Sequence, residues 1–143
     1  MITGQDFITV ASRWVALQNG CEPTLRSSVS RAYYGAFHCA VSMLREIGVP
    51  EPVSNKNKHT FVQNALLSSG NQNAAKAGSM LASLHEQRKN ADYDIASTFS
   101  GQQSARDAVE DATTIRQLLA TCDSAAKAQI GSIITAWKIR THQ

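Results

Sequence analysis

Cysteine is scarce in this chain, and its spacing forms no framework. The 143 residues include only Cys21, Cys39 and Cys122, which lie far apart and form no C-x-x-C pair. An odd number of isolated cysteines argues against both a disulfide framework and a zinc site. Because a reducing compartment suits free thiols, we expect a cytoplasmic protein with no metal site and no cofactor.

Long apolar runs and nucleotide-binding signatures are also missing. No run reaches the roughly 18 apolar residues of a membrane span, and the first residues lack the basic start and apolar stretch of a secretion signal. Neither G-x-x-x-x-G-K-[ST] nor G-x-G-x-x-G occurs, which argues against P-loop and Rossmann sites. His85 and Glu86 do not begin an H-E-x-x-H motif, because residue 89 is lysine. We therefore expect no membrane contact and no zinc-dependent hydrolysis.

Charge of either sign is low. The chain has 14 Lys and Arg against 11 Asp and Glu, a formal net charge of +3. This mild basic bias is compatible with a nucleic-acid partner without requiring one. Lys56, Lys58 and His59 form a small basic patch that could contact phosphate, but a solvated loop is the commoner explanation for such residues. Since 43% of the residues are hydrophobic, the chain can bury one core, and we expect a single domain over residues 1–143.

Helical periodicity is what the sequence has in abundance. Apolar residues recur at i, i+3 or i+4 and i+7, and no segment reads convincingly as a strand. Thr3 and Asp6 mark the first helix start in the manner of a capping box, and glycine and proline separate later segments. The fold class is therefore predicted as all-α, a compact up-and-down bundle of five to six helices. The predicted helices cover residues 3–17, 25–47, 61–66, 74–91, 105–119 and 130–137, with a break at 93–101.

The second predicted helix carries a polar line opposite its apolar face. Arg31, His38 and Arg45 are seven residues apart and so lie on one side, flanked by Tyr34 and Ser42. This side is either a solvated face or a contact surface for a ligand or a second copy of the chain. Tyrosine and histidine are amphipathic and common in contacts, which favours the second alternative.

The fourth predicted helix places an arginine on its apolar seam. His85, Arg88 and Asp92 share one face, and a buried guanidinium without a partner would cost several kcal/mol. Asp92 could pair with Arg88 and anchor the helix end. Alternatively, Arg88 binds phosphate or stabilises charge in phosphoryl transfer, while Asp92 positions it and Tyr93 adds a hydroxyl. Arg26 falls in the apolar arc of the second helix and also needs a partner or a route to water.

Two sequence elements resemble the HEPN family of small helical domains. Residues 31–38 read R-A-Y-Y-G-A-F-H and are similar to an R-x-Y-Y-x-x-F/Y-H element in one branch of the family. Residues 88–94 read R-K-N-A-D-Y-D and are similar to the R-x-x-A-D-Y-D element of the same branch. The similarity spans residues 25–120 and implies an all-helical HEPN-like bundle that works in prokaryotic defence or toxin-antitoxin systems.

The resemblance also implies an activity and a partner. One HEPN branch consists of metal-independent ribonucleases whose R-x4-6-H motif faces its copy across a homodimer and uses the RNA 2′-hydroxyl as nucleophile. Other members accompany nucleotidyltransferases. This chain supplies the arginine as Arg88, but its nearest histidine, His85, comes before that arginine.

Three function classes follow. The one we favour is a module that binds RNA, a nucleotide or a nucleotidyltransferase-type partner through Arg88 together with Arg31, Tyr34 and His38. The alternative is an endoribonuclease toxin in which Arg88, Asp92, Tyr93 and His85 or His38 form the catalytic group. The third is a purely structural dimerisation module. In each class we expect a homodimer in which the second and fourth helices approach the two-fold axis.

Overall fold

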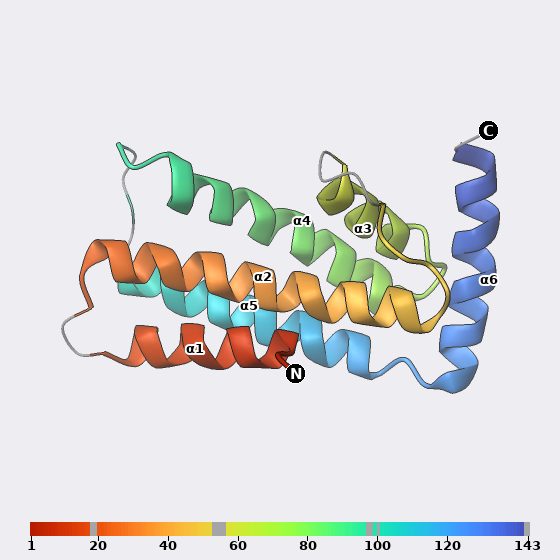
Figure 1. The fold of residues 1–143 in the computed structure, drawn as a ribbon, viewed down its shortest axis with the longest axis horizontal. Helices are drawn as coiled ribbons and strands as arrows, with labels where there is room; N and C mark the ends of the chain where they lie inside the picture. Colours follow the sequence, from red (N-terminus) through yellow and green to blue (C-terminus); the bar gives the residue numbers. More distant parts are fainter. Residues whose placement is uncertain (18–19, 53–56, 97–98, 100, 142–143) are drawn as a thin grey trace.

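The chain folds into helices joined by short loops (Figure 1). The structure is a computed structural model that describes residues 1–17, 20–52, 57–96, 99 and 101–141. Within these residues there are six helices and no strand, so the predicted all-α class is confirmed. The helices are α1 (Gly4–Ala16), α2 (Glu22–Glu46), α3 (Lys58–Leu67), α4 (Gln72–Tyr93), α5 (Gln102–Ala120) and α6 (Ser124–Thr141).

Four of the helices form the body of the bundle. In Figure 1, α1, α2, α4 and α5 run along the long axis and alternate in direction, as expected for an up-and-down bundle. The short α3 lies beside the first half of α4, and α6 crosses the end of the bundle. The sequence periodicity predicted these helices but not the crossing orientation of α6.

Local signals set several helix ends. Thr3 caps α1 in a capping box, in which its backbone N–H donates to Asp6 Oδ2 over 2.7 Å. Gly48 after α2 and Gly70 after α3 have φ values of +84° and +71°. Only glycine adopts this left-handed region without strain, so these positions end their helices where the sequence predicted breaks.

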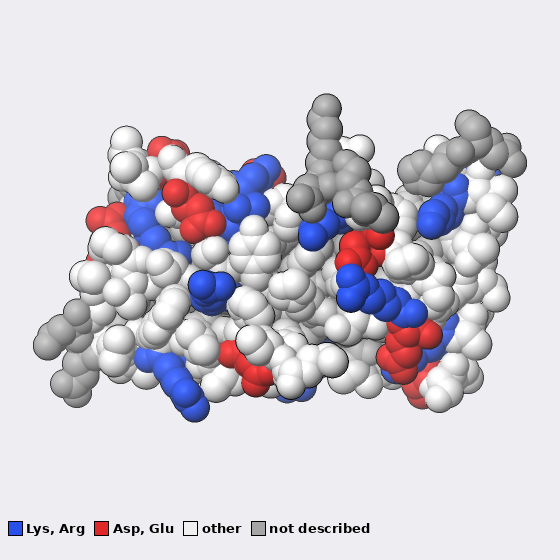
Figure 2. Space-filling model, in the orientation of Figure 1, with Lys and Arg blue, Asp and Glu red and all other residues white. Residues whose placement is uncertain are grey.

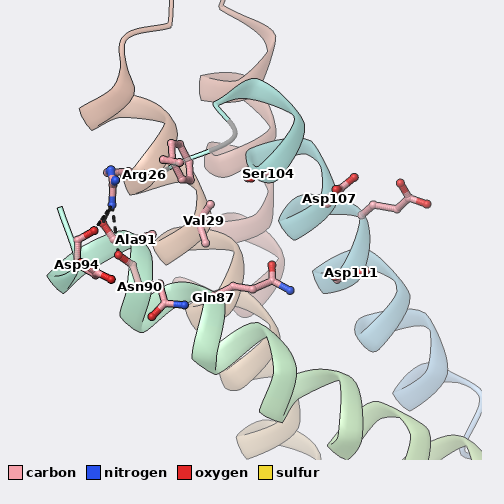
Figure 3. Close-up of a pocket in the computed structure, with 11 residues that line it drawn as sticks. Arg26, Val29, Gln87, Asn90, Ala91, Asp94, Ser104, Asp107 and Asp111 are labelled. Carbon is pink, nitrogen blue, oxygen red and sulfur yellow. Dashed lines mark hydrogen bonds between the residues drawn. The ribbon is translucent and has the colours of Figure 1, made fainter. Parts of the chain in front are cut away.

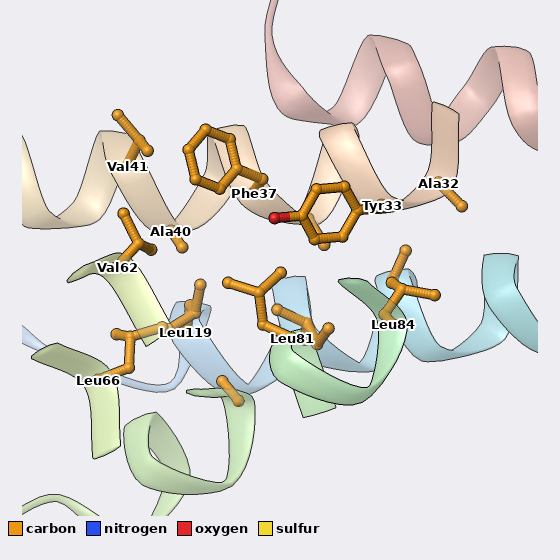
Figure 4. Close-up of a cluster of buried hydrophobic side chains, with 14 of the residues drawn as sticks. Ala32, Tyr33, Phe37, Ala40, Val41, Val62, Leu66, Leu81, Leu84 and Leu119 are labelled. Atoms are coloured by element: carbon orange, nitrogen blue, oxygen red, sulfur yellow. The ribbon is translucent and has the colours of Figure 1, made fainter. Parts of the chain in front are cut away.

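The core lies between α2 and the helices packed against it. Tyr33 and Phe37 of α2 are buried against Leu81 and Leu84 of α4 (Figure 4). These side chains follow the i, i+3/i+4 spacing of their helices, so one face of each helix is covered completely. Because α2 contacts α1, α3, α4 and α5, it is the central helix of the domain.

Helices α1 and α2 approach so closely that glycine is required between them. A Cβ atom on Gly35 would lie 2.8 Å from the Gly4 carbonyl oxygen and 2.6 Å from Ile8 Cγ1. These distances are far below ordinary contact, and the backbone oxygen has no rotamer by which to move away. Gly35 therefore fixes the spacing of the two helices.

We expect Gly35→Ala to destabilise the protein even though alanine is the better helix former. Propensity alone would favour alanine by about 1 kcal/mol, whereas overpacking a tight contact costs about 1–3 kcal/mol or more. Urea unfolding should show a net loss of at least about 1 kcal/mol. Ser42→Ala, on the exposed side of α2, should change stability by less than about 0.5 kcal/mol. A Gly35→Ala protein as stable as wild type would contradict the close approach.

Candidate functional site

Helices α2 and α4 bury the Arg88 guanidinium among aromatic rings. Arg88 lies on α4 and is only 6% exposed. Its guanidinium carbon lies 5.5 Å from the ring centre of Tyr33, 5.4 Å from that of Tyr34 and 5.7 Å from that of Tyr93. Cation–π contacts of this kind are favourable and retain the positive charge in a partly desolvated place.

The polar neighbours of Arg88 accept hydrogen bonds from only some of the donors of its guanidinium. Its Nη1 lies 3.5 Å from Asp92 Oδ2, a long ion pair, and Asp92 also accepts from Ser30 Oγ over 3.1 Å. Arg88 Nη2 contacts His85 Nε2 over 3.0 Å. The buried Nε has no hydrogen-bond partner among the described residues. The expected Arg88–Asp92 pair is therefore present, but it leaves one donor of a buried cation unmatched.

His85 acts as an acceptor for Arg88. Since arginine only donates, His85 Nε2 must carry the lone pair, and the ring is neutral with its proton on Nδ1. Nδ1 lies 3.0 Å from Gln63 Nε2, and a 180° rotation of that amide places its oxygen there as the acceptor. Burial, followed by the positive charges of His59 and Arg88, lowers the pKa of His85 to about 4.

His59 brings a second imidazole to the same place. Its ring centre lies 4.7 Å from that of His85. The Tyr33 hydroxyl lies 2.6 Å from His59 Nδ1. Burial raises the pKa of Tyr33, so the hydroxyl stays protonated: it donates to Nδ1 when the His59 proton is on Nε2, and accepts when that proton is on Nδ1. In the first of these tautomers the Nε2–H of His59 is a donor with no hydrogen bond to the residues that the structure describes. Burial, then Arg88 and Lys58, lower the pKa of His59.

The assignment of His59 to a solvated loop was wrong. Lys58 and His59 form the first turn of α3, and α3 packs against α4, which turns His59 toward Arg88. Lys56 lies outside the described residues. The i, i+4 spacing of His59 and Gln63 was the available sequence signal, because both side chains reach His85 from one face of α3.

The other predicted site residues divide into two groups. Tyr34 and Tyr93 lie against Arg88, although Tyr93 is 76% exposed. Arg31 and His38 are exposed and instead contact Phe7 of α1, at 5.5 Å from the guanidinium carbon and 5.3 Å between ring centres. The structure thus gathers His85, Arg88, Asp92, Tyr34 and Tyr93 and leaves Arg31 and His38 on the outer face of α2.

Arg26 forms hydrogen bonds with partners that could not be identified from the sequence. Its Nη1 donates to the carbonyl oxygens of Asn90, Ala91 and Asp94 at 3.1–3.2 Å (Figure 3). Its Nε donates to Glu22 Oε1 over 3.0 Å. Carbonyls at a helix C-terminus lack partners within the helix, so Arg26 closes the end of α4. It also lines a groove of about 630 Å³ between α2, α4 and α5.

The charge pattern of the surface, the hydropathy of the helices and the placement of acidic, His and Cys side chains add little information about function. Figure 2 shows separate Lys and Arg groups, with acidic side chains between them, on the face formed by α1, α2 and α4. They form no continuous basic stripe among the described residues of this face. Across the described ranges, no helix is apolar and long enough to cross a bilayer. The described residues also contain no group of three His, Cys, Asp or Glu side chains placed to hold a metal.

We expect His85 to make the fold less stable as the pH falls from 7 to 5. Its pKa of about 4 in the folded protein is below the ordinary value of 6.5, so the unfolded chain binds this proton more readily. The stabilisation is complete above pH 6.5 and is lost as the pH falls toward 4. Because the ring is partly exposed, we reduce the expected loss for solvent screening to about 1 kcal/mol at pH 5.

Urea unfolding at pH 7 and pH 5 tests this expectation. Wild type should lose more stability than His85→Gln, because the amide oxygen still accepts from Arg88 but does not titrate. The other acidic and histidine groups are common to both proteins and cancel to first order. An equal loss in the two proteins would show that His85 titrates normally in the folded state.

The comparisons with known proteins concern the whole bundle. The chain matches no curated protein and no solved structure. The family model described as HEPN domain matches residues 15–122, from the end of α1 to just beyond α5. Helix α6 lies outside the matched range. The matched range is well over half of the chain. It contains Arg88 and the residues around it, the Arg88 cluster, which consists of Tyr33, Tyr34, His59, Gln63, His85, Arg88, Asp92 and Tyr93. This chain therefore belongs to the HEPN domain family.

Proposed function

We propose that this HEPN domain binds a phosphate group of RNA or of a free ribonucleotide at Arg88 and His59. The observation that carries the proposal is the buried guanidinium of Arg88, whose Nε is unmatched and whose carboxylate partner is 3.5 Å away. A phosphate offers several acceptor oxygens to a guanidinium fork and fills this deficit better than one distant carboxylate.

The two histidines support phosphate binding rather than catalysis. Both have lowered pKa values because of burial, so they are mostly neutral at pH 7. A neutral His59 still offers its Nε2–H as a donor, whereas Tyr34 and Tyr93 offer ring faces for a sugar or base. A general acid must hold a proton before the reaction, and a low pKa makes that form scarce.

Membership of the HEPN family supports a proposal about the biological system in which the domain works. We propose that the domain works in a prokaryotic defence or toxin-antitoxin type system, as HEPN proteins do. In such a system a nucleotidyltransferase-type protein would be its partner.

A metal-independent endoribonuclease is the second candidate, favoured by one contact. The His59 and His85 rings lie 4.7 Å apart beside Arg88, so two proton carriers and a phosphate-binding cation share one site. One histidine would take the proton of the RNA 2′-hydroxyl as that oxygen attacks phosphorus. The other would protonate the departing 5′-oxygen, leaving a 2′,3′-cyclic phosphate. His59 here takes the place expected for His38, which lies against Phe7.

Binding measurements test the first candidate. Fluorescence anisotropy with a labelled single-stranded RNA should show at least about tenfold weaker binding for Arg88→Gln, because charge-assisted hydrogen bonds contribute about 1.5–3 kcal/mol. His59→Phe keeps the ring but removes its donor and should weaken binding by a smaller factor. Arg106→Gln, an exposed arginine of α5, is the matched control and should bind within about twofold of wild type.

The same protein variants distinguish the remaining candidate functions. Competition by AMP or ATP as effective as by RNA identifies a nucleotide site rather than an RNA site. RNA cleavage that survives EDTA, leaves 2′,3′-cyclic ends and is lost in both Arg88→Gln and His59→Phe would establish the enzyme instead. Unchanged binding by a folded Arg88→Gln protein, with no cleavage by wild type, would leave only the structural module.

We also propose that the protein is a homodimer with α2 and α4 near the two-fold axis. Ile95, just after α4, is 77% exposed, and Tyr93 at the end of α4 is 76% exposed. Phe7 and Val10 line an apolar hollow of about 320 Å³ next to Arg31. Apolar groups left open on one side of a small domain are typical of an interface.

Light scattering at tens of micromolar should therefore give twice the chain mass of 15.5 kDa. Ile95→Asp should shift the protein toward the monomer, because it buries a charge at the proposed interface. Ile139→Asp makes the same change on α6, where isoleucine is 57% exposed, and should leave the dimer intact. A monomeric wild type at this concentration would refute the assembly.

A further inference from the structure

A second concave site lies on the other side of α3. It is a groove of about 780 Å³ between α3, α6 and the segment that follows α2. Its floor and walls are mainly apolar and include Phe61, Trp137 and Pro52. Amide side chains of Asn57 and Asn64 stand at its rim. The groove depends on α6, which is outside the range that the HEPN family model matches.

The residues that line the groove suit a ligand that carries both a flat aromatic ring and a negatively charged group. The Phe61 and Trp137 rings are 6.0 Å apart between centres and inclined by 41°. Phe61 is only 7% exposed and forms the floor, so the half-buried Trp137 supplies the aromatic ring that a ligand can reach. Lys138 Nζ lies 5.7 Å from the Phe61 ring centre. The one carboxylate in the lining, Glu51, pairs with Arg45, which lowers the pKa of Glu51 and offsets its charge.

Helix α3 separates this groove from the Arg88 cluster. His59 and Gln63 are one turn apart and contact His85, whereas Thr60 and Asn64 are one turn apart and line the groove. Consecutive residues of one short helix therefore belong to two sites. An extended linear ligand that passes over the first turn of α3 would contact both sites.

We propose that the groove binds an unstacked base of a single-stranded RNA whose phosphate backbone passes α3 to Arg88. Stacking on aromatic side chains together with amide contacts to the base edge is how proteins bind single-stranded RNA. The position of the bound phosphate rests on the proposed function of Arg88. The base site itself rests on Trp137, Lys138 and the amides, and the two are tested separately.

Tryptophan fluorescence reports on the groove directly. The chain has two tryptophans, Trp14 and Trp137, so Trp14→Phe leaves Trp137 as the sole emitter. Titration of this protein with a single-stranded oligoadenylate should quench Trp137 in a saturable manner. Tripolyphosphate, which has charge but no base, should leave the emission unchanged. In the reciprocal Trp137→Phe protein, Trp14 emission should not respond to the RNA.

Affinity provides a second measurement. Trp137→Ala should weaken oligoadenylate binding by at least about fivefold, the lower end of the effect of losing one stacked base. Its affinity for tripolyphosphate should equal that of wild type. Asn64→Ala, a change at an exposed rim position that leaves the core intact, should weaken only the RNA. Circular dichroism would verify that each variant folds.

The outcomes distinguish the two sites. Quenching of Trp137 that persists in Arg88→Gln would support the groove and refute the phosphate site. RNA binding that depends on Arg88 without any change in Trp137 emission would refute the groove and support the phosphate site. Saturating RNA that neither quenches Trp137 nor discriminates Trp137→Ala from wild type overturns the base-binding proposal.

Discussion

The buried guanidinium of Arg88 is the constraint on which the arrangement of α2, α3 and α4 depends. A cation in this position must be surrounded by acceptors and ring faces, and no single helix supplies enough of them. Helix α4 provides His85 and Asp92, and α2 provides Tyr33 and Tyr34. Helix α3 contributes Gln63, which contacts His85, and His59, whose ring stacks on that of His85. The cluster therefore couples the relative positions of three helices.

The same constraint sets the electrostatic character of the site. Burial, and after it the positive charge of Arg88, lowers the pKa of both neighbouring imidazoles and so favours their neutral forms. The contact with Arg88 then fixes the tautomer of His85, with its proton on Nδ1 toward Gln63. An anion that approached Arg88 would oppose this effect and make both histidines easier to protonate. Binding of an anion at Arg88 would therefore be linked to proton uptake.

Much of the fold could be predicted from the sequence, but less of the site could. Helical periodicity located the helices, and the i, i+3, i+7 spacing of His85, Arg88 and Asp92 put them together because all three lie on one helix. His59 could not be placed in this way, since its position depends on how α3 packs on α4. The outer stripe of α2 was predicted as one surface, yet Tyr34 turns toward Arg88 while His38 turns toward Phe7. Spacing defines a face, and only packing defines what that face contacts.

Arg26 has a consequence for the order in which the domain assembles. Its three carbonyl acceptors lie 64 to 68 residues further along the chain, whereas the α1–α2 contact joins neighbours in sequence. Closing so long a loop costs entropy that local contacts do not incur. The α1–α2 hairpin can therefore form first. The end of α4, and with it Asp92 and Tyr93, becomes fixed only when distant segments meet, so the proposed phosphate site is completed after the local helix pair has formed.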